Sequence, residues 1–368
     1  MRLSSDPAAR RRLVLLCGAA LLALAIGVAV GGGDDDDAGA PEARRQSAAQ
    51  AAREAVDGLS LRQQVGQLTV SSFPETRPPV YVRRRLGAGE TAGVILFGFN
   101  ASSPADWRRL TGRIQGNAHD GALVMVDQEG GDVRTVAWAG PATPQSQQGS
   151  PASVRSSARA SALQLRGAGV NVNLAPVADT PGSVIGSRAF SQDVSASTAA
   201  SVEGMWSARL AATAKHFPGL GRADVNTDDG SATSTPELAP FRAAIVAKVP
   251  LIMLSHALYP ALDTNRIGSQ APRVVTDLLR DQLGFKGVVV TDSLEAQAVL
   301  DRSGIAVAAE RSIRAGADLI LMTGSASWND VFPRLLERAR GDRAFRQRVR
   351  ESAARVLALK QRLGLRLP

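Results

Sequence analysis

The 368-residue chain has very few of the residues that build disulfide scaffolds and zinc sites. Its one cysteine, Cys17, lies inside an apolar run, so the rest of the chain contains no disulfide. Its three histidines, His119, His216 and His256, are far apart, and no cysteine lies near them at a metal-ligand spacing. We therefore exclude a disulfide framework and a Cys/His zinc site, and we expect no metal and no organic cofactor.

The chain also lacks a recognisable nucleic-acid-binding module, although its formal net charge is +9. Arginine carries most of the positive charge and is scattered along the sequence among glutamates and aspartates. A nucleic-acid-binding domain is expected to gather its basic residues on one face or along one helix. This pattern instead indicates a solvated surface, and we predict no nucleic-acid partner.

One long apolar run is present, Leu13–Val30, between the arginines at 10–12 and the aspartates at 34–37. Its 18 residues are just enough to span a bilayer. Basic residues before such a run stay in the cytoplasm, so the rest of the chain is exported. We predict a signal peptide or transmembrane anchor over residues 1–33 and an acidic, alanine-rich linker over residues 34–57. The remainder is then extracytoplasmic, either membrane-anchored or secreted.

Residues 58–368 contain eight short apolar runs rich in β-branched residues, separated by amphipathic segments typical of helices. This alternation predicts an α/β fold, and the length suits a single (β/α)8 TIM-type barrel followed by C-terminal helices. The predicted strands are Val65–Val70, Gly93–Phe97, Ala122–Val126, Val170–Leu174, Leu210–Ala214, Leu251–Leu254, Val288–Thr291 and Asp318–Met322.

A doubly wound open sheet would show the same alternation of strands and helices. That fold is expected to carry a glycine-rich phosphate turn after its first strand. The segment Ser71–Pro74 follows the first strand here and contains no glycine. The absence of this turn favours the barrel.

Polar and charged residues stand where the predicted strands end. In a parallel barrel these ends meet on one rim, where active sites form. Six charged or imidazole-bearing ends together are difficult to explain as helix caps, so we predict a catalytic rim. Its members are Asn100, Asp127, Glu129, Asp179, Arg188, Lys215, His216, His256, Asp292, Glu295 and Thr323.

Several of these residues lie in long segments that resemble glycoside hydrolase family 3, above all its β-N-acetylglucosaminidase branch. Lys215–Gly221 is similar to the family's KHFPGHG, Val126–Val133 to its DQEGGRV, and Leu283–Asp292 to its LGF-x-GVVVTD. The segments Asn171–Asp179 and Leu254–Ala261 match two further motifs. The matches occur in the family's order over about residues 60–325.

The resemblance implies a retaining hydrolase in which Asp292 is the nucleophile and forms a covalent glycosyl ester. From position alone, Asp292 is equally able to cap a helix beginning near Ser293. The resemblance further implies a sugar-binding set of Asp127, Arg188, Lys215 and His216. His256 either joins this set or braces its own turn, and Arg134 is a candidate because the arginines usual in that motif are Asp132 and Thr135 here.

The chain departs from the family where the proton donor is expected. Alignment from Lys215 places Leu220 at the second histidine of the motif, and Asn226 and Asp228 at the family's Asp-x-His pair. Asp228 is our candidate acid/base because it occupies the histidine position and is titratable. Its rivals are Asp224 and Asp229 in the same loop; weaker candidates are Glu129, Glu203 and Glu295.

The resemblance therefore predicts removal of terminal β-linked sugars, with N-acetylglucosamine, including that derived from peptidoglycan, as the first substrate expected. A β-glucosidase of the same family is one alternative. A sugar-binding protein that has lost acid/base catalysis is the other, although the presence of Asp292 argues against it. The sequence predicts neither the linkage nor the oligomeric state.

Overall fold

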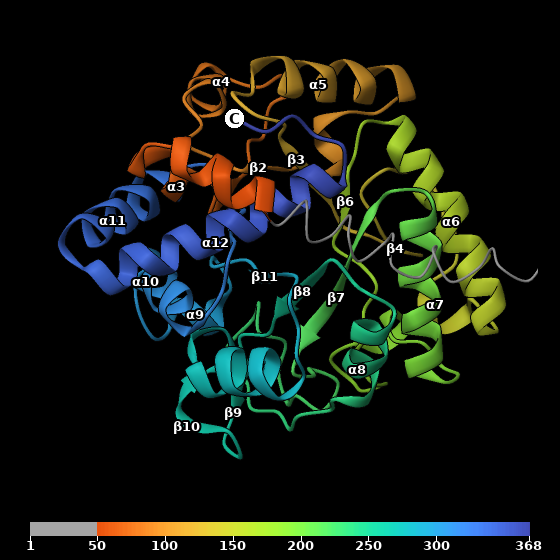
Figure 1. Ribbon diagram of the computed structural model, residues 1–368. Coiled ribbons are helices and arrows are strands. Elements are labelled where there is room, and N and C mark those ends of the chain that lie inside the picture. Colours follow the sequence, from red (N-terminus) through yellow and green to blue (C-terminus); the bar gives the residue numbers. More distant parts are fainter. Residues whose placement is uncertain (1–49) are drawn as a thin grey trace, which may run out of the picture. The chain divides into compact units, whose positions relative to one another are not determined.

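Eight parallel strands form the central sheet of the computed structural model, which describes residues 50–368 (Figure 1). They pair in the order β12, β1, β2, β3, β6, β7, β8, β11, and a bridge between Val290 and Leu319 joins the two outer strands. The predicted barrel is thus confirmed. Its strands are β1 (Thr69–Ser71), β2 (Gly93–Ile95), β3 (Leu123–Val126), β6 (Val172–Asn173), β7 (Ala211–Phe217), β8 (Leu251–Leu254), β11 (Val288–Thr291) and β12 (Ile320–Leu321).

Helices surround the strands (Figure 1). The longer ones are α3 (Leu61–Gly66), α4 (Val80–Gly87), α5 (Pro104–Asn117), α6 (Pro151–Gly167), α7 (Val194–Ser207), α8 (Ala239–Val246), η5 (Arg273–Gln282), α9 (Gln297–Leu300), α10 (Ile305–Ala315), α11 (Trp328–Gly341) and α12 (Arg343–Arg362). The loops carry two hairpins and four short turns: β4 (Gln128–Gly130) with β5 (Val133–Arg134), β9 (Leu258–Tyr259) with β10 (Asp263–Ile267), η1 (Gly98–Asn100), η2 (Gln145–Gln147), η3 (Gly186–Arg188) and η4 (Gly268–Gln270).

The first strand begins later than its apolar run predicts. Ser60 and Gln63 form a capping box, in which Gln63 N donates to Ser60 Oγ at 3.3 Å and Ser60 N donates to Gln63 Oε1 at 3.0 Å. This reciprocal cap starts α3, and Val65 packs in the core from that helix. The prediction of a strand from Val65 was therefore wrong for its first residues, because the capping signal outweighed β-branched composition.

The C-terminal helix α12 closes the N-terminal end of the barrel. Its residues Val356, Leu359 and Leu363 belong to the same buried cluster as the inward-facing strand residues Val70 and Met125. In Figure 1, α12 crosses the middle of the view, over the strands. The opposite end, where the strands finish, is left for the loops that carry the candidate site.

A buried ion pair holds α12 to this end of the barrel. Lys360 Nζ lies 2.6 Å from Asp120 Oδ2 and 2.9 Å from Gln67 Oε1, and its side chain is 0% exposed. Burial lowers the pKa of Lys360, and the carboxylate of Asp120 opposes that shift. Each member of such a pair depends on the other to offset its lost hydration.

Replacing Lys360 with methionine should lower the free energy of unfolding by about 3–5 kcal/mol, because Asp120 would remain buried without its cation. Chemical denaturation measures the change. The matched control is Arg155→Gln, which breaks an exposed ion pair with Glu203 and should cost less than about 1 kcal/mol. Adding Asp120→Asn to the Lys360 variant should restore part of the loss; equal losses at the two sites would contradict the prediction.

The predicted membrane segment, Leu13–Val30, and the boundary at residue 33 lie outside the described residues. Within residues 50–368, none of the helices is both long enough and apolar enough to cross a bilayer.

Candidate active site

A hollow of about 490 Å³ opens where the barrel strands end. Strands β2, β7, β8 and β12 and the loops that follow the barrel strands form its wall, as expected for the C-terminal rim of a barrel. Its polar and charged lining consists of Asp127, Glu129, Arg188, Lys215, His216, Asn226, Thr227, Asp228, Asp292, Ser293, Glu295 and Thr323.

Lys215 lies at the centre of an ion-pair network on one side of this hollow. Its Nζ is 2.7 Å from Asp127 Oδ1 and 2.7 Å from Glu129 Oε1, and its side chain is buried. Arg188 completes the network through two parallel contacts of 2.8 Å with the carboxylate of Glu129. Two cations therefore alternate with two carboxylates, and these contacts fix the orientation of each side chain.

These contacts determine the charge states of the network. Burial alone would raise the pKa of Glu129, but Lys215 and Arg188 outweigh it and lower that pKa to about 2. Burial alone would lower the pKa of Lys215, but Asp127 and Glu129 raise it. Glu129 is thus an ionised structural partner at neutral pH, which removes it from the acid/base candidates.

Replacing Glu129 with glutamine should destabilise the protein by roughly 3 kcal/mol above pH 4.5, given the shift of its pKa from 4.5 to about 2. The depressed pKa means that the wild type keeps this stability above the unfolded-state pKa. It loses the advantage as the pH falls from 4.5 towards 2, so the two proteins should converge there. Urea unfolding at several pH values measures the difference; a gap that is independent of pH would contradict the assignment.

His216 links the network to Asp292. Its Nδ1 lies 2.7 Å from Asp179 Oδ2, and its Nε2 lies 3.7 Å from Asp292 Oδ2. Asp179 is fully buried and also accepts backbone N–H groups of His216 and Leu220. These bonds fix the ring of His216 so that its second nitrogen points at Asp292.

Asp292 follows directly after β11, and solvent reaches 22% of its side chain. Burial would raise the pKa of this carboxyl, but His216, His256 and Lys215 together lower it. The next helix, α9, begins at Gln297, and Ala296 precedes it as the cap residue. The capping interpretation of Asp292 is therefore wrong, and the carboxylate remains ionised beside the hollow.

Asp228 lies in the loop after β7 and lines the same hollow. Partial burial and the negative charge of Asp292 raise the pKa of Asp228. Among the described residues, its carboxylate has no hydrogen-bond partner; only its backbone is held, through Asn226 and Gln297. A carboxyl with a raised pKa and free oxygens is available to donate a proton.

The rival carboxyl groups lie elsewhere. Asp224, Asp228 and Asp229 are all exposed in this loop, but Asp224 and Asp229 do not line the hollow, and Asp224 accepts the backbone N–H of Thr233. Glu203 pairs with Arg155 on the outer helices. Glu295 does line the hollow, but hydrogen bonds engage both of its oxygens.

Glu295 Oε2 accepts from the Ser293 hydroxyl at 2.9 Å and from Thr323 N at 3.0 Å. Its Oε1 accepts from Gly324 N at 2.8 Å and from Ser327. A carboxylate with so many donors is fixed in place. Glu295 thus braces the rim between β11 and β12.

Two predicted binding residues do not line the hollow. The guanidinium of Arg134 donates to the carbonyls of Gly131 and Ala137. His256 is fully buried, with Nδ1 2.8 Å from Ser269 Oγ and Nε2 3.0 Å from the carbonyl of Ser293. His256 therefore acts as a brace, but it braces the segment after Asp292 through Ser293 and not only its own turn, as the sequence alternative had it.

A search of residues 50–368 finds no group of three or more His, Cys, Asp or Glu side chains arranged to hold a metal ion. The carboxylates of the hollow are instead paired with Lys215, Arg188 and His216. The chemistry proposed below needs only these protein groups and water.

Comparison with known proteins agrees with this geometry. Residues 60–359 match the family model described as the glycosyl hydrolase family 3 N terminal domain. The chain belongs to glycoside hydrolase family 3. The resemblance predicted from the motifs is confirmed, and with it the assignment to the glycoside hydrolases.

Individual relatives show which members of the family are similar. A beta-hexosaminidase of Xanthomonas oryzae pv. oryzae is 34% identical over 254 residues, which cover 63% of this chain and 76% of the relative. The structure resembles a family 3 β-N-acetylglucosaminidase from Paenibacillus, with a TM-score of 0.80 and 31% identity, covering 83% of this chain. This chain spans only 63% of that longer protein. A β-N-acetylhexosaminidase from Beutenbergia cavernae has a TM-score of 0.75 and 30% identity, covering 82% of this chain and 99% of the other.

Sequence reasoning missed the roles of two residues. Asp179 was predicted on the rim but not as the partner that orients His216. Glu129 was predicted only as a weak proton donor. The sequence did contain a signal for its role as an ion-pair partner of Lys215. Asp127 and Glu129 are two residues apart in an extended segment, so their side chains lie on the same side of it, and both face Lys215.

Proposed function

We propose that this protein is a retaining β-N-acetylhexosaminidase that removes terminal β-linked N-acetylglucosamine. The observation that carries the proposal is the contrast between two carboxyl groups of one hollow. The environment lowers the pKa of Asp292 and raises the pKa of Asp228. Two carboxyl groups whose pKa values are shifted in opposite directions suit the roles of nucleophile and acid.

In the first step, a carboxylate oxygen of Asp292 attacks the anomeric carbon of the bound sugar. The bond from this carbon to the leaving oxygen breaks as Asp228 transfers its proton to that oxygen. The products are a glycosyl ester on Asp292 and the released alcohol. The lowered pKa of Asp292 favours the ionised form that attacks, and the raised pKa of Asp228 favours the protonated form that donates.

In the second step, water attacks the anomeric carbon and gives a proton to the Asp228 carboxylate. The ester bond breaks, Asp292 is freed, and the sugar leaves with its original β configuration. Asp228 ends the cycle protonated, ready for the next substrate. Acid and base roles therefore alternate on one residue, as retention requires.

The Lys215 network suits a sugar ring. Asp127 is 29% exposed at its side chain, so its carboxylate is able to accept hydroxyl protons while Lys215 holds it in place. Arg188, 30% exposed, and His216 present further donors. The names of the similar proteins, beta-hexosaminidase and β-N-acetylglucosaminidase, support N-acetylglucosamine over glucose.

Two aryl β-N-acetylglucosaminides test the function. One carries a leaving group that departs without protonation, and the other needs a proton. We expect the purified chain to hydrolyse both, with a higher kcat/KM than for the matching β-glucosides. A preference for β-glucosides would favour the β-glucosidase, and binding with no turnover of either compound would establish the sugar-binding alternative.

We also propose that the enzyme works outside the cytoplasm, anchored or secreted through its N-terminal segment, on peptidoglycan-derived sugars. The arginines before Leu13–Val30 support this orientation. Cell fractionation with protease accessibility tests it, because an extracytoplasmic barrel is cleaved in spheroplasts. Protection of the barrel in intact spheroplasts would contradict the proposal.

A further inference from the structure

A second hollow, of about 680 Å³, lies on the outside of the barrel between η4 and α10. No carboxylate lines it. Four arginines from three segments, namely β10, the loop before α10, and α10 itself, line it together with one buried amide. These residues are Arg266, Arg302, Arg311, Arg314 and Gln270.

Two of the arginines are neutralised by neighbours. Arg314 lies 3.1 Å from Glu310 and 2.7 Å from Asp342. Arg266 has a long contact of 3.8 Å with Asp263. These pairs fix the guanidinium groups at the edge of the hollow but leave donors unused.

The other polar groups have little or no compensation. Arg302 donates to the carbonyl of Asn265 at 3.4 Å and interacts electrostatically with the adjacent Asp301, and the exposed Arg311 has no ion-pair partner within residues 50–368. Gln270 is only 5% exposed, and its Nε2 has no hydrogen-bond partner in the part of the chain described. A buried amide without a partner is costly, and its presence points to a ligand that the hollow is built to receive.

We propose that this hollow binds a phosphate group. Guanidinium groups recognise oxyanions through paired N–H donors, and the hollow supplies several such groups without any opposing carboxylate in its lining. Inorganic phosphate and a phosphomonoester have three or more terminal oxygens and accept more of these donors than a carboxylate can, whereas a phosphodiester offers two terminal oxygens around a tetrahedral phosphorus. The shared chemistry fits inorganic phosphate, a phosphomonoester or a phosphodiester of an envelope polymer.

Phosphate binding in this hollow should restrain the active-site loop that contains Asp228. Arg302 follows directly after the short α9 segment, whose N-terminal backbone holds that loop: Gln297 N donates to the carbonyl of Asp228, and Ala298 N donates to that of Thr227. Fixing Arg302 onto a phosphate therefore tightens the segment that positions the candidate acid/base.

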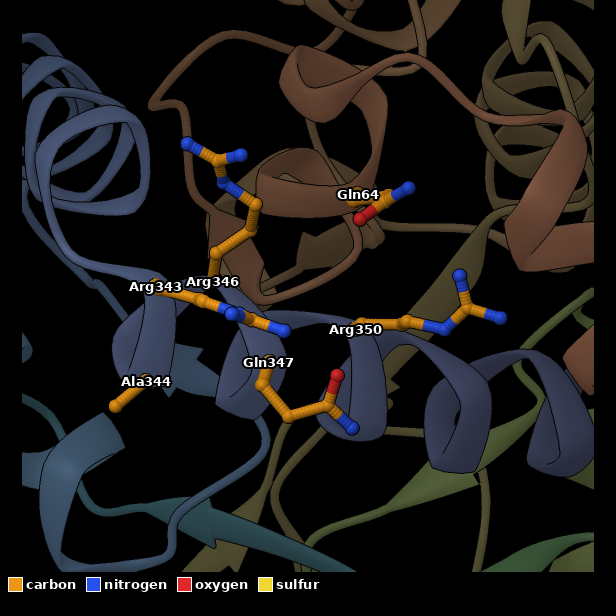
Figure 2. Close-up of a pocket in the computed structure, with 6 residues that line it drawn as sticks. All are labelled: Gln64, Arg343, Ala344, Arg346, Gln347 and Arg350. Carbon is orange, nitrogen blue, oxygen red and sulfur yellow. The ribbon is translucent and has the colours of Figure 1, made fainter.

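A third hollow, beside α12, provides the matched control (Figure 2). It is also rich in arginine, but its arginines come from one helix. Arg346 donates to the carbonyls of Ala339 and Arg340, and Arg350 pairs with Asp57. Figure 2 shows Arg343, Arg346 and Arg350 along α12, with Gln64 and Gln347 near them. Neither of these amides is buried.

The test is calorimetric titration of the full chain with inorganic phosphate, glycerol 3-phosphate and a glycerol phosphodiester, followed by hydrogen exchange of the loop over 224–231. We expect saturable binding and slower exchange in that loop. Arg302→Gln/Arg311→Gln should weaken binding at least about tenfold, because two charged hydrogen-bonding groups are lost. Arg343→Gln/Arg350→Gln, with the same change in charge, should bind as the wild type does.

A second, nearly isosteric variant tests whether weaker phosphate binding comes from the altered site and not from misfolding. Gln270→Glu is nearly isosteric, and its carboxylate should occupy the arginines and lower phosphate affinity at least about tenfold. Binding limited to the phosphodiester would identify a polymer as the ligand, and binding of the smaller compounds a solute. No saturable binding, equal loss in both double variants, or unchanged loop exchange would overturn the inference. Neither readout requires turnover, so a failure of the proposed hydrolysis leaves both results interpretable.

Discussion

Replacing Asp292 with asparagine should abolish hydrolysis, with kcat falling by on the order of 10⁴ to 10⁶. The carboxylate oxygen that forms the glycosyl ester is lost, while the shape of the side chain is kept. The Ser293 N–H that donates to Asp292 Oδ1 at 2.8 Å keeps an acceptor in the amide oxygen. Steady-state hydrolysis of an activated aryl β-N-acetylglucosaminide measures the effect.

Folding must be separated from chemistry in this variant. We expect its thermal stability and its affinity for N-acetylglucosamine to stay close to those of the wild type, since Lys215, Asp127 and His216 are untouched. Asp224→Asn is the matched control, because it neutralises an exposed aspartate that does not line the hollow. Residual activity within about tenfold of the wild type would rule out Asp292 as the nucleophile.

All eight barrel strands are buried, but only two of them have the bounds that the sequence predicted. β8 and β11 have the predicted bounds because each is a short run of apolar residues that no competing local signal interrupts. At β1 a capping box competes with the apolar run, and the helix takes the first residues. Local apolar composition identifies a barrel strand well, but it does not by itself say where the preceding helix ends.

The site was predictable where its residues stand at strand ends, as Lys215 and Asp292 do. Contacts between side chains that follow different strands could not be predicted from the sequence. Asp179 reaches His216 because the chain around Val177 runs beside Lys215 and bonds to it, with Ala178 N donating to the Lys215 carbonyl at 2.6 Å. That adjacency continues the parallel pairing of β6 with β7, which no short motif encodes.

Loop residues were the hardest to place. Arg134 turns back onto its own hairpin, where two of its N–H groups donate to the carbonyls of Gly131 and Ala137, a contact that the sequence does not reveal. Arg188, by contrast, sits in a short turn whose bidentate contact with Glu129 draws it into the hollow. Both arginines lie near the rim, but Arg134 donates to backbone carbonyls of its own hairpin, whereas Arg188 donates to the carboxylate of Glu129.

Replacing Asp228 with asparagine should slow hydrolysis by about 10² to 10⁴ when the leaving group needs a proton. A leaving group that departs unprotonated should still form the glycosyl ester, so the variant should accumulate a species heavier by one sugar residue at Asp292. Intact-protein mass spectrometry detects it. Azide, which attacks without general-base help, should then release the sugar as an azide of retained configuration.

The pH profile gives an independent readout of the same residue. Asp228 must be protonated to act as the acid, so kcat/KM of the wild type should fall as the pH rises through its raised pKa, and the Asn variant should lose this limb. The fall at low pH, as Asp292 gains a proton, should remain in both proteins. Asp229→Asn, one residue along the same loop, is the control and should keep both limbs. If that control and not Asp228→Asn lost the basic limb, the proton donor would be Asp229, and the alignment that places Asp228 at the family's histidine would be wrong by one residue.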